Sequence, residues 1–152
     1  LFSCSALRYA KEFKLSESEL AQLGRLRHIH ATVPKDWDKY AVHVIEPLLM
    51  LAKERGTIVR TQAWRNKDRT TLAAEYSEGL QVLVSTMGSS NAPLTLRVMG
   101  DLGWRDLFFQ DSYSAFKSAL FEFVQGIINR DVRIDPEFML EVVNLIESGR
   151  VS

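Results

Sequence analysis

The residues best suited to contact a ligand lie at the tip of a predicted β-hairpin. Trp64, Arg65, Lys67 and Arg69 place one aromatic and three basic side chains within six residues of sequence. Basic side chains neutralise phosphates and an aromatic ring stacks on a nucleobase, which is how many proteins hold single-stranded nucleic acid. We therefore predict these four residues as a nucleic-acid-binding site, although solvated hairpin tips often have a similar composition.

Other residue types that do chemistry are scattered along the chain. His28 and His30 would lie together only on a strand, and they supply two of the four ligands that a closed zinc site needs. Surface or helix-end positions explain these two residues and His43 better. Cys4 has no clear base near it, and helix capping explains Asp135 without acid–base catalysis. Since Gly-rich phosphate loops and nucleophile elbows are also missing, we predict no catalytic, metal-binding or cofactor-binding residues.

Composition limits the classes of protein that the sequence can encode. With 152 residues, 46% of them hydrophobic, the chain can form one domain with its own core and is too apolar to be intrinsically disordered. No apolar run approaches the roughly 20 residues that cross a bilayer, so we expect no membrane span. The single cysteine excludes an internal disulfide and fits a reducing compartment.

Charge is unevenly distributed along a chain whose net charge is zero. Residues 55–69 hold five bases and one acid, a net charge of +4, whereas residues 101–152 hold five bases and nine acids, a net charge of −4. This asymmetry suggests separate basic and acidic faces, although a solvated surface explains the same pattern.

The N-terminal part divides into a leading segment and a helix. The first eleven residues contain no acid, which is typical of the end of a mitochondrial transit peptide and equally compatible with an ordinary frayed terminus. We therefore interpret residues 1–14 as transit-like or flexible and residues 15–152 as a single α+β domain. Ser16 and Glu19 match a capping box, from which leucine spacing extends a helix to about His28.

The middle of the chain has the composition of β-strands. Runs rich in β-branched and aromatic residues recur about every dozen residues, with Gly, Asn and Asp between them, which predicts an antiparallel meander. Residues 40–55 stay ambiguous, because β-branched residues favour a strand, leucine spacing favours a helix, and Pro47 disfavours the interior of either. The predicted strands are 57–64, 70–76, 80–87, 94–99 and 104–109.

Two amphipathic helices are predicted at the C-terminal end. Asp111 or Ser112 can cap the first, because their side-chain oxygens accept free backbone N–H groups. The second has Asp135 as its N-cap, Pro136 at its first helical position and Gly149 as its stop. We predict that their apolar faces form an oligomer or partner interface through Phe116, Phe123, Phe138 and Val142.

The order of these elements resembles that of the mitochondrial acidic matrix protein family, also called the mitochondrial glycoprotein or complement globular-head receptor family. The resemblance implies that the chain is a divergent member of this family and that it assembles as a ring-shaped trimer. It also implies that residues 40–55 form a strand. The predicted fold is therefore α+β, with an N-terminal helix, a twisted antiparallel β meander of about seven strands, and two C-terminal helices packed on the sheet. The segments that carry the resemblance are the turn 53–57, the strands 57–64, 70–76, 80–87 and 93–99, the helix 115–124 and the turn 129–132.

This resemblance implies a non-enzymatic scaffold or assembly factor of the mitochondrial matrix. Such a protein would bind protein partners, as a homo- or hetero-trimer, in mitochondrial ribosome assembly or RNA processing, and it would need no cofactor. Two alternatives stay open: a direct single-stranded RNA-binding domain that uses residues 64–69, and a small enzyme with an unrecognised site. The missing catalytic constellation leads us to predict that the chain is not an enzyme.

Overall fold

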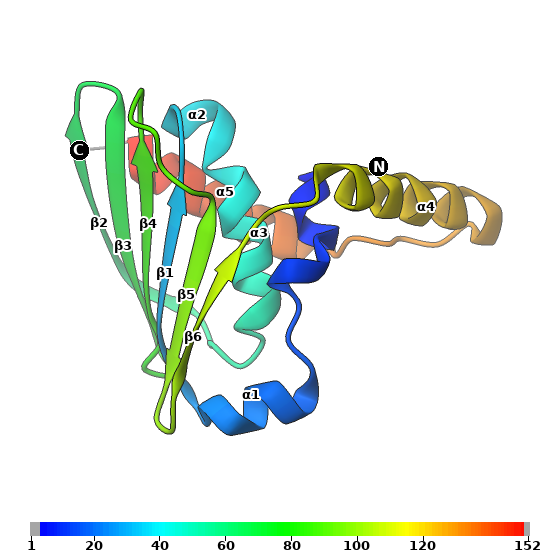
Figure 1. The fold of residues 1–152 in the computed structure, drawn as a ribbon, viewed down its shortest axis with the longest axis horizontal. Helices are drawn as coiled ribbons and strands as arrows, with labels where there is room; N and C mark the ends of the chain where they lie inside the picture. Colours follow the sequence, from blue (N-terminus) through cyan, green and yellow to red (C-terminus); the bar gives the residue numbers. More distant parts are fainter. Residues whose placement is uncertain (1–3, 151–152) are drawn as a thin grey trace.

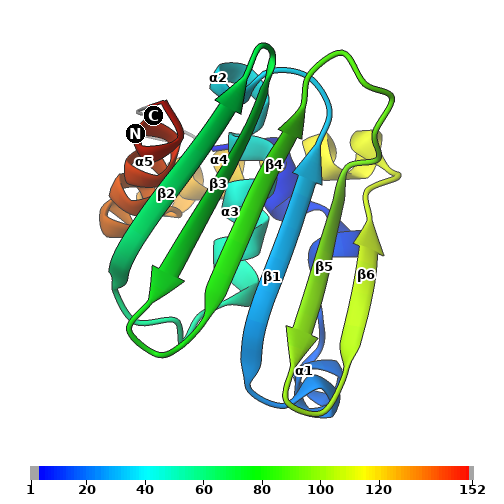
Figure 2. The same cartoon turned by 90° about the vertical axis from the view of Figure 1, so that its left-hand side faces the viewer.

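The computed structural model describes residues 4–150, which form one mixed β-sheet with helices gathered on one side (Figure 1). No helix of these described residues lies on the opposite face of the sheet (Figure 2). The strands are β1 (Leu26–Val33), β2 (Ile58–Asn66), β3 (Arg69–Tyr76), β4 (Gln81–Met87), β5 (Thr95–Gly100) and β6 (Trp104–Phe108). The helices are the 3-10 turns η1 (Ala6–Tyr9) and η2 (Lys11–Phe13) and the α-helices α1 (Glu17–Leu23), α2 (Trp37–Tyr40), α3 (Val42–Leu51), α4 (Ser112–Asn129) and α5 (Pro136–Arg150).

The sheet has the order β2-β3-β4-β1-β5-β6, so the predicted meander of about seven antiparallel strands is wrong. The five predicted strands are present as β2 to β6. However, β1 enters the middle of the sheet, where it pairs parallel with β4 and antiparallel with β5. A meander keeps sequence neighbours side by side, whereas this insertion separates β4 from β5.

Two segments of the chain differ in type from their predicted structure. The first helix ends at Leu23, and the residues predicted to continue it form β1, in which Ile29, Ala31 and Val33 point into the core. Residues 42–51, which the family resemblance favoured as a strand, form the buried helix α3. Burial against the sheet overrides the β preference of the branched residues there.

The N-terminal segment lies against α3. Between Ser5 and Lys14 the chain makes the two 3-10 turns, whose Leu7, Ala10 and Phe13 are buried in the hydrophobic core. The capping box that follows is confirmed, because Ser16 and Glu19 exchange side-chain-to-backbone hydrogen bonds.

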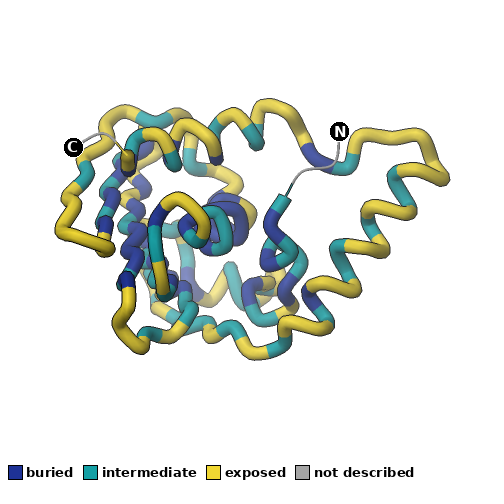
Figure 3. Tube along the Cα trace, turned by 90° about the horizontal axis from the view of Figure 1, so that it is seen from above, coloured by how far each residue is buried: buried dark blue, intermediate teal, exposed yellow. Residues whose placement is uncertain are grey.

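The two C-terminal helices are present, but only α5 packs on the sheet, where it contacts β2 and β3. Helix α4 packs against η1 and projects away from the sheet (Figures 1 and 3), so the predicted packing of both helices on the sheet is wrong. The caps are confirmed: Asp111 accepts the N–H of Ser114, and Asp135 precedes Pro136 and accepts the N–H of Glu137.

Gly149 does not end α5, because the helix continues to Arg150. A Cβ at this position would lie 2.1 Å from the ring of Trp37, so glycine is needed here for close packing of α5 against α2. The Trp37 indole N–H also donates to the Ile146 carbonyl at 2.9 Å, which fixes the ring beneath the helix.

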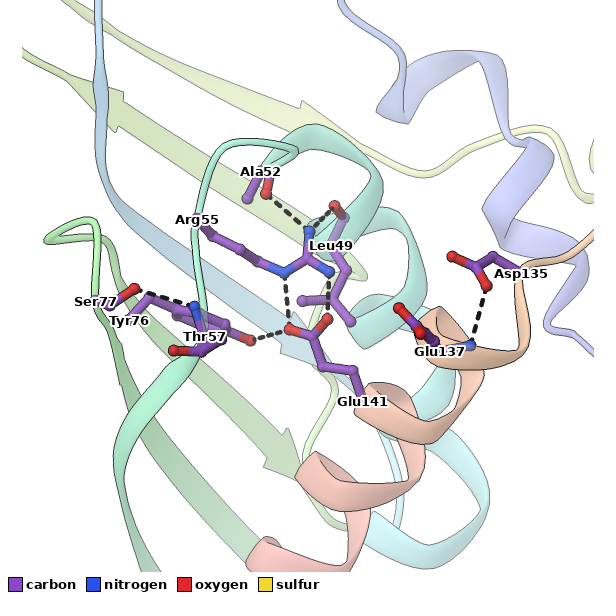
Figure 4. Close-up of polar contacts among 9 residues, drawn as sticks. All are labelled: Leu49, Ala52, Arg55, Thr57, Tyr76, Ser77, Asp135, Glu137 and Glu141. Atoms are coloured by element: carbon purple, nitrogen blue, oxygen red, sulfur yellow. Dashed lines mark hydrogen bonds and ion pairs between the residues drawn. The ribbon is translucent and has the colours of Figure 1, made fainter.

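A partly buried ion pair joins α5 to the segment just after α3 (Figure 4). The Arg55 guanidinium contacts the Glu141 carboxylate, and Tyr76 donates its hydroxyl to the same carboxylate at 2.9 Å. Arg55 also donates to the carbonyls of Leu49 and Ala52, which lie in the last turn of α3 and just after it. Every charged group in this cluster has a partner, so we assign it a structural role.

Candidate active site

The candidate active site lies where the N-terminal segment crosses the start of α3. Ser5 caps η1, because its hydroxyl oxygen accepts the backbone N–H of Leu7. Leu7 and Phe13 hold this segment in the core. On α3, His43 and Glu46 are three residues apart and so share one face of the helix. That face is the one on which the N-terminal segment lies.

Ser5 connects the histidine to the carboxylate. Its backbone N–H donates to Oε1 of Glu46 at 2.8 Å, and its Oγ lies 2.7 Å from Nδ1 of His43. Arg8, one turn along η1, places Nη1 at 3.8 Å from Oε2 of Glu46. Four polar side chains from two elements therefore converge in one small volume.

Glu46 is completely buried. Burial raises the pKa of its carboxyl group to about 7, against the opposing effects of the Ser5 N–H and the Arg8 guanidinium. Within residues 4–150, neither Oε2 of Glu46 nor Nη1 of Arg8 has a hydrogen-bond partner. Because an unpaired buried polar atom costs about 1–3 kcal/mol, such atoms are typical of sites that a ligand or water completes.

His43 has the properties of a general base. Burial lowers the pKa of its imidazole, so the ring is neutral near pH 7. Among the described residues its Nε2 has no hydrogen-bond partner. In the tautomer whose Nδ1–H donates to Ser5 Oγ, the lone pair on Nε2 can accept a proton from a substrate hydroxyl.

The neighbouring thiol and phenol stay protonated. Burial, together with the charge of Glu46, raises the pKa of the Cys4 thiol to about 11. Burial raises the pKa of the Tyr9 phenol to about 12. Because a thiol attacks as its thiolate, the site is suited to proton transfer rather than to nucleophilic attack by Cys4.

The predicted nucleic-acid-binding residues lie on the β2–β3 hairpin but do not share one surface. Trp64 is 51% exposed and lies on the open face of the sheet, whereas Arg65 points to the helical side and donates to the Arg150 carbonyl at 3.1 Å. Lys67 occupies the turn with a positive φ, and Arg69 is exposed at the start of β3. RNA binding at this hairpin stays a prediction.

The predicted interface residues divide between two environments. Phe116, which is 64% exposed, and Phe123 lie on α4, while Phe138 packs under the Arg8 guanidinium and Val142 is buried in the core. Only Phe116 and Phe123 therefore lie on exposed surface. Whether they contact a partner stays a prediction.

His28 and His30 were expected to lie together only if their segment formed a strand, and they lie together on strand β1. His28 and His30 lie on the open face of the sheet, opposite the side on which Ile29 is buried. No group of three metal-ligating side chains occurs between residues 4 and 150, and within that range no helix is long and apolar enough to cross a membrane.

Sequence reasoning missed the cluster around Ser5, His43 and Glu46. The one local signal was the spacing of His43 and Glu46, which is informative only if residues 40–55 are a helix. Ser5 is 38 residues from His43 in the sequence, so only the folded chain brings the two together.

No family model and no curated protein matches the chain, but solved structures share its fold. GenD2 from gentamicin A biosynthesis, in complex with NAD, has a TM-score of 0.76 at 14% identity, over 95% of this chain and 59% of that chain. UDP-N-acetylglucosamine 3-dehydrogenase GnnA from Acidithiobacillus ferrooxidans has a TM-score of 0.66 at 14% identity, over 86% of this chain and 55% of that chain. A putative myo-inositol dehydrogenase from Sinorhizobium meliloti has a TM-score of 0.68 at 13% identity, over 93% of this chain and 59% of that chain.

These neighbours overturn the resemblance to the mitochondrial acidic matrix protein family. One neighbour is a complex with NAD and the other two are named as dehydrogenases, and the chain spans less than two thirds of the length of each. The non-enzymatic scaffold and the ribosome-assembly role, which depended on that family, are therefore wrong. The prediction that the chain is not an enzyme, which was based on the missing catalytic constellation, is also wrong. The alternative of an enzyme with an unrecognised site fits the neighbours better. The mitochondrial location and the trimeric partners are not tested and stay predictions.

Proposed function

We propose that this chain supplies the proton-transfer residues of an NAD-linked oxidoreductase that acts on a hydroxyl group of a sugar or cyclitol. The observation that carries the proposal is the buried cluster of Ser5, His43 and Glu46 on this particular fold. The names of the neighbours supply the substrate class: an intermediate of aminoglycoside synthesis, a nucleotide-linked amino sugar and an inositol.

The residues of this chain do not form a dinucleotide site of the βαβ type. Such a site needs neighbouring parallel strands and a Gly-rich turn that approaches the pyrophosphate. Here β1 and β4 are the one parallel pair among the described strands, and the sequence contains no G-x-G-x-x-G. We therefore assign no step of NAD chemistry to this chain and place the NAD-binding unit outside the given sequence.

The apolar stripe of α4 is the surface that we assign to that NAD-binding unit. The stripe consists of Phe116, Leu120 and Ile127, each more than half exposed and spaced along one face of the helix. Exposed apolar surface of this kind marks an interaction site. Helix α4 also packs on η1, next to Ser5, so a unit docked here would close over the candidate active site.

In the proposed reaction, the Nε2 atom of His43 accepts the proton of the substrate hydroxyl. Ser5 holds the imidazole in the required tautomer through Nδ1. Glu46 orients Ser5 by accepting its backbone N–H. Burial keeps His43 neutral, which is the form that a base needs.

The proposal is tested by nitrogen-15 NMR of the histidine side chains in the full chain. Addition of myo-inositol, UDP-N-acetylglucosamine or a gentamicin-type aminoglycoside should shift the Nε2 resonance of His43. His28 and His30 serve as matched internal controls, because they lie on the open face of the sheet. If none of these compounds shifts His43, or if all three histidines shift alike, the proposed site is wrong.

A chimera provides the corresponding test of catalysis. This chain replaces the matching part of GenD2, whose remaining part is kept, and NADH formation is measured with a panel of polyols. His43→Ala should lower the rate by about 100-fold or more, the typical contribution of a general base. Equal rates with and without His43 would contradict the assignment of this residue.

A further inference from the structure

A groove beside the candidate active site differs from it in chemistry. It has a volume of about 410 Å³ and lies between the N-terminal segment and the first half of α4. This size is within the range of small-molecule sites. The groove is lined by Tyr9, Lys14, Ser114, Lys117, Ser118, Phe121 and Glu122.

The lining carries two cations that nothing in the described chain neutralises. Lys14 and Lys117 form no ion pair with any residue between 4 and 150, whereas Lys11 nearby pairs with Asp111. The acid in the lining, Glu122, already contacts Arg133 at 3.6 Å. Two free ammonium groups facing one groove favour an anion that both can contact.

Hydroxyl and aromatic groups extend the same surface. Ser114, Ser118 and Phe121 follow i, i+4 and i+7 spacing, so they share one stripe of α4, which lies on a different side of the helix from the apolar stripe proposed to dock the NAD-binding unit. The Phe121 ring is 59% exposed and can stack on a flat heterocycle. Cations, hydroxyls and an exposed ring together match a nucleoside diphosphate.

The groove also connects to the proton-transfer residues. Tyr9 lines the groove at one end of η1, and Ser5 caps the other end beside His43. With a rise of about 2 Å per residue in a 3-10 helix, these two residues lie about 8 Å apart along its axis. In the proposed binding mode, a sugar attached to a diphosphate held by the lysines extends along η1 toward His43.

We propose that this groove binds the diphosphate of a nucleoside-diphosphate sugar, which deepens the proposed function and rests on it. A cationic aminoglycoside would be repelled by Lys14 and Lys117, and a neutral cyclitol would leave both ammonium groups without a counter-ion. The substrate class that fits the groove is therefore a nucleotide-linked sugar, with its phosphates on the lysines and its base on Phe121.

The test uses UDP, inorganic pyrophosphate, uridine and NAD⁺ as probes in titrations of the full chain by calorimetry and NMR. UDP and pyrophosphate should shift the amides of the groove and uridine alone should bind weakly. The Lys14→Ala/Lys117→Ala double variant should lose about tenfold or more in UDP affinity, because two charge-assisted contacts are removed. Lys53→Ala is the matched control, since Lys53 is exposed and lies outside the groove.

Two further arms separate the failure of this inference from the failure of the proposed function. UDP-N-acetylglucosamine should shift His43 as well as the groove, whereas UDP should shift the groove alone. The His43→Asn variant should keep its UDP affinity. In the natural chain, UDP binding without any effect of UDP-N-acetylglucosamine on His43 would support the groove and reject the active site. Tight binding of NAD⁺ with no binding of UDP, or equal UDP affinity in the double variant, would overturn the inference.

Discussion

Glu46 determines how the stability of this protein depends on pH. Its carboxyl group is completely buried, and burial raises its pKa to about 7, well above the value in an unfolded chain. Between about pH 4.5 and pH 7 the folded state therefore binds a proton that the unfolded state releases. The contribution of Glu46 to stability is therefore greatest at the acid end of this window and falls as the pH rises through it, whereas the lowered pKa of His43 contributes with the opposite sign.

The variant Glu46→Gln should remove this pH dependence, because an amide does not titrate. Across this window, the contribution of Glu46 to the free energy of unfolding of the natural protein should fall by about 3 kcal/mol at most. Denaturant unfolding followed by tryptophan fluorescence at a series of pH values measures it. Glu54→Gln, an exposed carboxyl on the loop after α3, is the control and should leave the slope unchanged. A natural protein that loses no more stability across this window than the Glu46→Gln variant would contradict the assigned environment of Glu46.

The residues of the candidate site could not be found from local sequence patterns. Pro47 and the β-branched residues before it made the helical position of His43 ambiguous, although Pro47 lies inside α3. The other half of the site, Ser5 and Arg8, is in the segment that was interpreted as transit-like or flexible. Neither residue type is unusual in such a segment, so only the folded chain identifies their contacts with α3.

At the scale of elements, the close contact between α2 and α5 depends on a glycine, which has no side chain. Gly149 lies against the Trp37 ring, where a Cβ would approach to 2.1 Å. Gly149→Ala should therefore destabilise the protein by about 1–3 kcal/mol, the usual cost of overpacking a core, although alanine favours a helix more than glycine does. Thermal or denaturant unfolding measures the change.

Gly126→Ala is the matched control, because Gly126 lies within α4 and its closest neighbour is the Arg133 side chain at 3.0 Å. An arginine stem can move, whereas the buried Trp37 ring is fixed, so this variant should change stability by less than about 1 kcal/mol. Equal effects of the two variants would show that helix propensity, rather than contact with Trp37, determines the role of Gly149.

The strands were easier to predict than their order. Strands β2 to β6 have clear turns between them, and those turns were sufficient to place them. The alternation in β1 includes Ile29, Ala31 and Val33, but it follows helix α1 after a short gap, and the leucine spacing continued into Leu26. The insertion of β1 between β4 and β5 depends on pairing over long sequence distances, which local composition does not encode.

At the scale of the whole molecule, α4 is the helix that projects away from the sheet (Figure 1). It packs mainly against η1, and among its large apolar side chains Phe116 and Ile127 are more than 60% exposed. A helix with such a stripe is either covered by a partner or exposes apolar surface to water. In our proposal the NAD-binding unit covers it.

The double variant Phe116→Glu/Ile127→Glu tests this assignment on the chain alone. Because both side chains are exposed, the free energy of unfolding should change by less than about 1 kcal/mol, whereas Leu145→Ala in the buried core should cost about 2–5 kcal/mol. Binding of the dye ANS to the native protein should fall, since the dye reports exposed apolar surface.

The same double variant in the GenD2 chimera separates docking from folding. If the stripe contacts the NAD-binding unit, NADH formation should fall although the chain itself stays as stable as before, and unfolding of the chimera should divide into two transitions. A loss of stability in the isolated chain similar to that of Leu145→Ala would mean that α4 packs against its own domain in solution. The stripe would then be part of the core, and the NAD-binding unit would have to dock elsewhere.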